Sequence, residues 1–179
     1  EPLAGFAQTA PIALRTVVHG LSQPVAFVQD PSSPRVQYVV EQGGRIRVVV
    51  DGALQSNDFL DLTDVVRYEG EQGLLGLALP ADYGHNGRCY VLFTDQAGNT
   101  VVSRFTRSLR DPLAADPASR FDFEWSTGLR YIAQPATLHK GGTMRFGPDG
   151  FLYIGLGDGG VANDAPGPAQ DPRSLLGKM

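Results

Sequence analysis

MRFGPDGFLYIGL, residues 144–156, is the stretch that decides the fold. An apolar run leads into a Gly-Pro-Asp-Gly turn, and a Tyr-led apolar run follows it, which is the pattern of two antiparallel strands. The same order occurs twice earlier, as AFVQDPSSPRVQYVV at 26–40 and LALPADYGHNGRCYVLF at 77–93. The tyrosines of the three units, at positions 38, 90 and 153, lie 52 and then 63 residues apart. The sequence therefore predicts a repeated strand-turn-strand unit.

A repeat period near 50 residues is typical of β-propeller blades, each of which holds several antiparallel strands. The other apolar runs are also short and β-branched, as in RIRVVV at 45–50 and TVVSRFT at 100–106. Only residues 60–68 suggest one short turn of helix. We therefore predict an all-β fold with about three four-stranded antiparallel blades. A β-sandwich whose turns match by coincidence is the alternative.

Three blades cannot close a ring, because a propeller has typically four to eight. Open edge strands would remain, and exposed edges are prone to aggregate. We therefore expect a partial propeller, completed by a missing C-terminal half or by a second chain. The opening EPLAGFAQTAP has neither an initiator Met nor an apolar signal-peptide core, so either a signal peptide has been removed or the chain has been trimmed. We expect the first, a mature exported protein that is periplasmic or secreted.

Composition limits the class of protein. Charged residues make up 19% and hydrophobic residues 42% of the 179 residues, which is the balance of a globular domain. The net charge is -4, and without a basic stripe we expect no binding of nucleic acid. No apolar run approaches the roughly 20 residues that a membrane-spanning helix needs, so we expect no membrane span. The single cysteine, Cys89, excludes an intrachain disulfide.

One glycine motif invites a cofactor assignment that its context excludes. The glycines at 155, 157 and 160 match G-x-G-x-x-G after a strand. A dinucleotide site also needs a helix whose N-terminus meets the pyrophosphate. VANDAPGPAQDP follows instead, and it cannot form that helix. The three histidines are scattered without zinc-ligand spacing, so we predict neither a Rossmann site nor a zinc site.

Two segments carry the candidate chemistry, GEQGLLGLAL at 70–79 and LHKGGTMRFGPDG at 138–150. In both, a polar residue precedes a glycine that opens a strand. The innermost strands of a propeller begin near its central channel, so these polar residues are expected at the channel mouth. Glycine there is expected to let a flat ligand approach the backbone.

His139 and Asp158 lie 19 residues apart, at the two ends of one predicted hairpin. Antiparallel strands bring both ends to the same side of the sheet. An Asp can then accept from one imidazole nitrogen and leave the other nitrogen free as a base. A structural histidine and an Asp that closes a turn remain the alternative on spacing alone.

GEQGLLGLALPADY and LHKGGTMRFGPDGFLYIGLGDGG resemble the soluble PQQ-dependent glucose/aldose dehydrogenase family, also called the glucose/sorbosone dehydrogenase family. QPVAFVQDP, YVVEQGGRIRVVVDG and DPRSLLGKM fit it too. The resemblance runs from about Leu21, which divides the chain into a segment 1–20 and the N-terminal half of a propeller domain at 21–179. It implies a six-bladed propeller that holds pyrroloquinoline quinone (PQQ) with calcium. The implied reaction oxidises an aldose to its lactone, with hydride transfer to PQQ and onward transfer to an external electron acceptor.

By position, the resemblance implies that His139 is the catalytic base and Asp158 its orienting partner. It implies a cofactor contact for Gln72 and substrate contacts for Glu71 and Asn163. Metal ligands stay unassigned, since the family's calcium ligands and its cationic cofactor contacts come later in the chain. A calcium ion held by Asp158, Asp164 and Asp171 is an alternative to a solvated loop there.

Three departures from the family pattern bear on sugar specificity. Glu71 stands where the best-known members have an amide, Leu138 where some have an acidic sugar contact, and Lys140 where many have Asn. Two other functions stay open beside the dehydrogenase. One is a catalytically silent propeller that serves as a binding module, and the other is a calcium-dependent, lactonase-like propeller.

Overall fold

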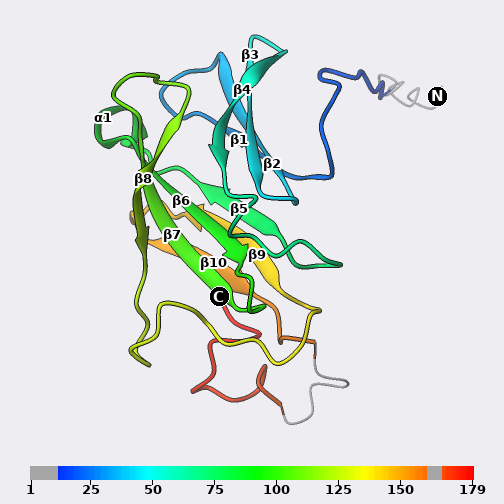
Figure 1. Ribbon diagram of the computed structural model, residues 1–179, viewed down its shortest axis with the longest axis vertical. Helices are drawn as coiled ribbons and strands as arrows, with labels where there is room; N and C mark the ends of the chain where they lie inside the picture. The colour runs from blue at the N-terminus through cyan, green and yellow to red at the C-terminus, as the bar shows by residue number, and fades with distance from the viewer. Residues whose placement is uncertain (1–11, 161–166) are drawn as a thin grey trace, which may run out of the picture.

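The computed structural model describes residues 12–160 and 167–179, and this part of the chain is almost entirely β. Two four-stranded antiparallel sheets and one hairpin follow one another along the chain (Figure 1). The first sheet has the order β1 (Pro24–Gln29), β2 (Val36–Glu41), β3 (Arg45–Val50), β4 (Ala53–Asp61). The second has the order β5 (Leu74–Ala78), β6 (Arg88–Thr94), β7 (Thr100–Arg107), β8 (Ala115–Asp122). The hairpin pairs β9 (Gly141–Phe146) with β10 (Leu152–Leu156).

Each predicted strand-turn-strand unit is the first hairpin of a sheet, so the predicted all-β fold and partial propeller are confirmed. The turn aspartate holds the strand tyrosine in two of the three units. The Tyr38 hydroxyl donates to Asp30 Oδ2 at 3.2 Å, and the Tyr153 hydroxyl donates to Asp149 Oδ2 at 2.6 Å. The third predicted blade shows only two strands in the described residues.

Helical structure is confined to short turns in the described residues. The turn of helix expected over 60–68 is only a hydrogen-bonded turn, in which the Val66 N–H donates to the Leu62 carbonyl at 2.9 Å, because Leu60 and Asp61 belong to β4. The helix α1 (Tyr83–Asn86) lies in the turn between β5 and β6 and ends at Gly87, whose φ is 63°. No helix among the described residues is long and apolar enough to cross a membrane.

The first strands of the three units, β1, β5 and β9, lie side by side, as the inner strands of propeller blades do. Glycine permits the close approach of β5 and β9. A Cβ on Gly76 would lie 2.3 Å from the carbonyl oxygen of Gly142, and a Cβ on Gly142 would lie 2.5 Å from Leu75 Cβ. Any side chain at these two positions would force the neighbouring inner strands apart.

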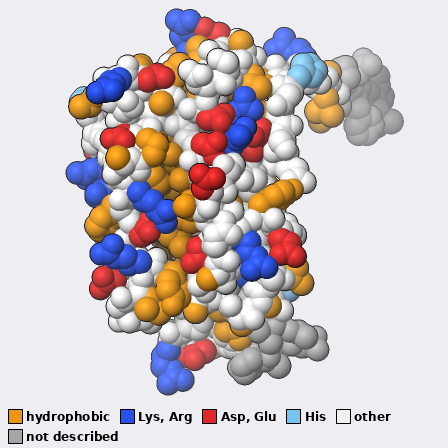
Figure 2. All heavy atoms as spheres, viewed as in Figure 1, with side chains coloured by type: hydrophobic (Ala, Val, Ile, Leu, Met, Phe, Trp, Pro, Cys, Tyr) orange, Lys and Arg blue, Asp and Glu red, His pale blue; other side chains and the backbone are white. Residues whose placement is uncertain are grey.

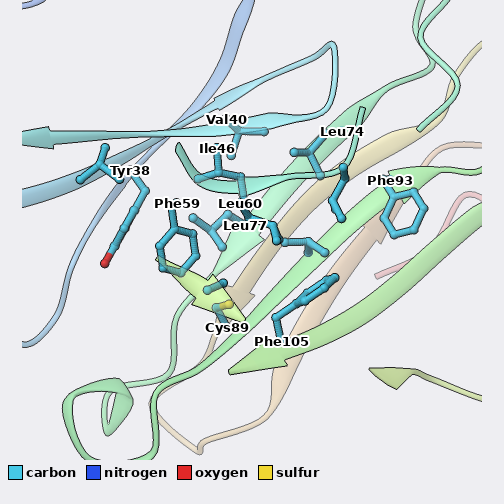
Figure 3. Packing of buried hydrophobic residues seen from close by; sticks show 14 of the residues in the cluster. Tyr38, Val40, Ile46, Phe59, Leu60, Leu74, Leu77, Cys89, Phe93 and Phe105 are labelled. Atoms are coloured by element: carbon cyan, nitrogen blue, oxygen red, sulfur yellow. The ribbon is translucent and has the colours of Figure 1, made fainter. Parts of the chain in front are cut away.

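The main core fills the space between the two four-stranded sheets. Figure 3 shows Val40 and Ile46 of the first sheet facing the same space as Leu74, Phe93 and Phe105 of the second. All five are fully buried. Alternate side chains of each strand enter this layer, because the period of a strand is two residues. Packing between sheets therefore fixes how the first two blades sit, and with them the loops at their ends.

Cys89 lies in the same core and is fully buried. Burial raises the pKa of its thiol to about 12, so the thiol stays protonated at neutral pH. On the face shown in Figure 2, acidic and basic side chains are interspersed over the sheets.

Candidate functional site

Polar loops from all three units meet at one end of the sheets. The loops that precede β5 and β9 lie there, together with those that follow β2, β6 and β10, because the strands are antiparallel. Gln42 Nε2, after β2, donates to the carbonyl of Gly70 at 2.7 Å and to that of Gln72 at 3.0 Å. Lys140 Nζ donates to the Gly98 carbonyl at 3.3 Å, which joins the third unit to the second.

His139 and Asp158 form the side-chain pair that the sequence predicted. His139 Nδ1 lies 2.8 Å from Asp158 Oδ1 across the ends of the β9–β10 hairpin. The His139 side chain is 55% exposed, and that of Asp158 is 25% exposed. A carboxylate at Nδ1 favours the tautomer that carries its proton there, which leaves Nε2 as a proton acceptor. The pair therefore presents an oriented imidazole at the surface.

Asp158 is itself held in place. The backbone N–H of Gly160 donates to Asp158 Oδ1 at 2.8 Å, on the same oxygen that faces His139. The Gly160 N–H and the His139 imidazole together hold the pKa of the Asp158 carboxyl below its usual value. Asp158 is therefore ionised at neutral pH and available to accept from the imidazole.

The backbone at His139 adopts a conformation that few non-glycine residues take. Its φ is 52°, in the left-handed region, which costs about 1–3 kcal/mol. Contacts on both sides hold it. Its N–H donates to Glu71 Oε2 at 2.5 Å, and its carbonyl accepts from the Gly159 N–H at 3.3 Å. A Cβ on Gly157 would lie only 1.9 Å from that carbonyl oxygen, so glycine is required there for the observed approach.

Lys140 follows His139 and points inward. It is 1% exposed, and its ammonium donates to the carbonyls of Ala136 and Gly98. Burial, and then the positive charge of Arg67, lower the pKa of Lys140. The side chain therefore ties the loop that carries His139 to the second blade, and it does not reach the surface.

The other predicted site residues differ in their exposure and in their contacts. Glu71 is exposed and contacts the backbone of His139. Gln72 is 1% exposed, and its Oε1 has no hydrogen-bond partner among the described residues. Asn163 and Asp164 lie outside the described residues. The links made by Gly157 and by the Glu71 carboxylate were not predicted, since spacing alone does not show which loops touch.

The glycines that open the two strands are crowded by protein backbone. A Cβ on Gly73 would lie 2.4 Å from the Gln42 carbonyl oxygen, and one on Gly141 would lie 2.6 Å from that of Gly155. The expectation that a flat ligand approaches the backbone here stays a prediction, because Gly141 lines a hollow and a Cβ clash marks only one side of these glycines. They allow neighbouring segments of the chain to pack closely.

A hollow of about 410 Å³ opens beside the loop that carries His139, and neither His139 nor Asp158 is among its lining residues. It is lined by Val25, Gln42, Gly70, Glu71, Leu75, Lys140, Gly141, Gly142 and Thr143. Its volume is within the usual range for small-molecule sites. The described residues alone do not fit the grip on an anionic quinone, because Glu71 is acidic and the lining's one cation, Lys140, is buried. In the described ranges no three His, Cys, Asp or Glu side chains gather as a metal site.

Four-stranded antiparallel sheets with adjoining first strands, and an oriented histidine at the mouth of those strands, define part of a β-propeller with a polar site on its central face. The model of the glucose/sorbosone dehydrogenase family matches residues 21–179, and the chain belongs to this family. The resemblance found in the sequence is thereby confirmed.

The similar proteins include a protein named for an interaction and proteins named as sugar dehydrogenases. In sequence the chain is similar to the Hedgehog-interacting protein of Mus musculus, with 30% identity over 161 residues, which cover 86% of this chain and 23% of that protein. In structure it is similar to the PQQ-bound aldose sugar dehydrogenase of Streptomyces coelicolor, with a TM-score of 0.70 and 29% identity over 92% of this chain and 45% of that one.

A candidate oxidoreductase (glucose dehydrogenase) of Thermus thermophilus is also similar, with a TM-score of 0.67 and 30% identity over 91% of this chain and 45% of that one. The chain therefore spans less than half the length of these solved structures and about a quarter of the mouse protein.

Proposed function

We propose that this chain is part of a dehydrogenase that oxidises aldose sugars to lactones. The observation that carries the proposal is the His139–Asp158 pair, an exposed imidazole oriented by an ionised carboxylate. Lys140, next to His139 in sequence, and Glu71, in contact with it, line a hollow. Membership of the glucose/sorbosone dehydrogenase family and similarity to aldose and glucose dehydrogenases support the same substrate class.

In this proposal His139 Nε2 takes the proton of the anomeric hydroxyl, and Asp158 stabilises the imidazolium that forms. The hydride that leaves the anomeric carbon needs an acceptor that the described residues do not hold by themselves. PQQ is the proposed cofactor, because the similar Streptomyces coelicolor enzyme is PQQ-bound. Since the lining described above does not fit an anionic quinone, groups outside the described residues would have to hold it, and it would then supply the hydride acceptor. Calcium as its companion, an external electron acceptor and a periplasmic or secreted location belong to the same proposal.

The test uses the full product of the encoding gene, incubated with PQQ and CaCl2. Sugar-dependent reduction of a redox dye is expected, together with a change in the quinone absorbance on binding. Absence of both dye reduction and quinone binding would remove the dehydrogenase proposal.

A second function is favoured by a different observation. The mouse relative is named for its interaction with Hedgehog, a protein partner. The corresponding proposal is a propeller that binds another protein and does not oxidise sugar. It predicts no quinone binding in the assay above, and it also predicts that His139→Gln leaves partner binding unchanged.

A further inference from the structure

We infer that Glu71 is a positioning residue for His139, and that it acts through the backbone and not as a contact to the sugar. The inference deepens the dehydrogenase proposal and rests on it for its kinetic consequence. Its geometric basis is independent of that proposal. Glu71 Oε2 accepts the His139 N–H at 2.5 Å across 68 residues of sequence.

The contact holds a strained backbone from a neighbouring unit. His139 has a φ of 52°, and a residue with a Cβ stays in this region only where surrounding contacts over-determine it. The carbonyl side of His139 is held within its own hairpin, by Gly159. The N–H side is held by Glu71, which belongs to the loop before β5. Glu71 therefore supplies a link between blades at the His139 N–H, beside the one that Lys140 makes to Gly98.

The backbone on both sides of Glu71 is held by hydrogen bonds from Gln42. Gln42 Nε2 donates to the carbonyls of Gly70 and Gln72, on either side of Glu71. The carboxylate consequently projects from a backbone that is anchored to the first sheet. A hydrogen bond from a backbone N–H to a carboxylate is charge-assisted and about twice as strong as a neutral one. The arrangement can thus resist relaxation of the His139 backbone.

Loss of the Glu71 carboxylate leaves the His139 N–H without this acceptor. The left-handed backbone is then free to relax, and the imidazole moves relative to anything bound in the hollow. A misplacement of about 1 Å at a reacting group typically costs on the order of 100-fold in rate. A positioning residue therefore lowers kcat with little change in the KM for sugar, whereas a sugar contact raises KM.

The test compares Glu71→Ala, Glu71→Gln and the control Glu69→Ala in the full gene product with PQQ and calcium. Glu69 lies in the same loop, carries the same charge and is exposed, paired with Arg67. We expect Glu71→Ala to lower kcat about 10- to 100-fold with KM within about twofold. Glu71→Gln keeps an acceptor oxygen and should restore most of kcat. Glu69→Ala should match the unsubstituted protein.

Hydrogen exchange at the His139 amide supplies a readout that needs no activity. Loss of a hydrogen bond to a charged group should speed this exchange on the order of 10- to 100-fold in Glu71→Ala, and less in Glu71→Gln. Unchanged exchange, or a raised KM with kcat intact, overturns the inference. If Glu71→Ala speeds the exchange but the unsubstituted protein oxidises no sugar, the contact between Glu71 and His139 is upheld and the dehydrogenase proposal is rejected.

Discussion

Gly157→Ala tests whether close backbone packing sets the position of the base. The added Cβ would lie 1.9 Å from the His139 carbonyl oxygen and 2.6 Å from its carbonyl carbon, against the 3.4 Å at which ordinary contact begins. His139 would have to retreat by about 1.5 Å, the difference between these separations. Overpacking of this kind costs about 1–3 kcal/mol of stability. A displacement of about 1 Å or more at the base lowers kcat/KM by about 100-fold, or roughly 2.7 kcal/mol of transition-state stabilisation.

The assay is dye-linked sugar oxidation by the full gene product with PQQ and calcium, beside urea unfolding of each variant. Gly155→Ala is the matched control, since it lies two residues away on the same hairpin and its Cβ would make only ordinary contacts, at 3.7–3.9 Å. The control should keep nearly full activity and stability. Equal kcat/KM for the two variants would refute the reasoning that Gly157 positions His139.

Two further variants and one labelling experiment test the same structure. Asp158→Asn should lower kcat by about 100-fold or more in the dye assay, because the imidazole loses its carboxylate. The pKa of Asp158 is lower in the folded protein, so its carboxylate stabilises the fold above about pH 3.8, and this stabilisation is lost as the pH falls through the folded pKa. In urea unfolding measured across pH, the free energy of unfolding of Asp158→Asn should therefore fall less steeply in acid than that of the unsubstituted protein. Gly76→Ala should cost about 1–3 kcal/mol in urea unfolding by separating β5 from β9, whereas Gly43→Ala, with open space around its Cβ, should not. With a pKa of about 12 and no exposure, Cys89 should resist alkylation at about pH 8 in the native protein and react only in urea, and fast native labelling would contradict the buried assignment.

Local pattern was sufficient to predict the paired strands of each repeat and their turns, but not β4 and β8, whose sequences were not among the predicted runs. Asp30 and Asp149 were recognised as turn residues of a repeat, and both accept from the tyrosine of the strand that follows. The pairing of His139 with Asp158 was predictable as well, because the register of one antiparallel hairpin brings its two ends together.

The sequence pattern did not predict the contacts between blades. Glu71 and His139 are 68 residues apart, and only the packing of β5 on β9 brings them together. Gln72 is buried by a contact within its own blade, with the turn between β6 and β7, where a Cβ on Gly98 would lie 3.2 Å from Gln72 Nε2. Spacing along one segment carries no information about which surface of the loop the neighbouring blade covers.

The most direct test of the account is the steady-state rate of sugar oxidation by His139→Gln, in the full gene product loaded with PQQ and calcium. His85→Gln is the control, since His85 lies on α1 in the turn between β5 and β6. The account predicts a loss of about 10²- to 10⁴-fold in kcat for His139→Gln, with quinone binding retained, and an unaltered rate for His85→Gln. A His139→Gln protein that oxidises sugar at the unsubstituted rate would contradict it.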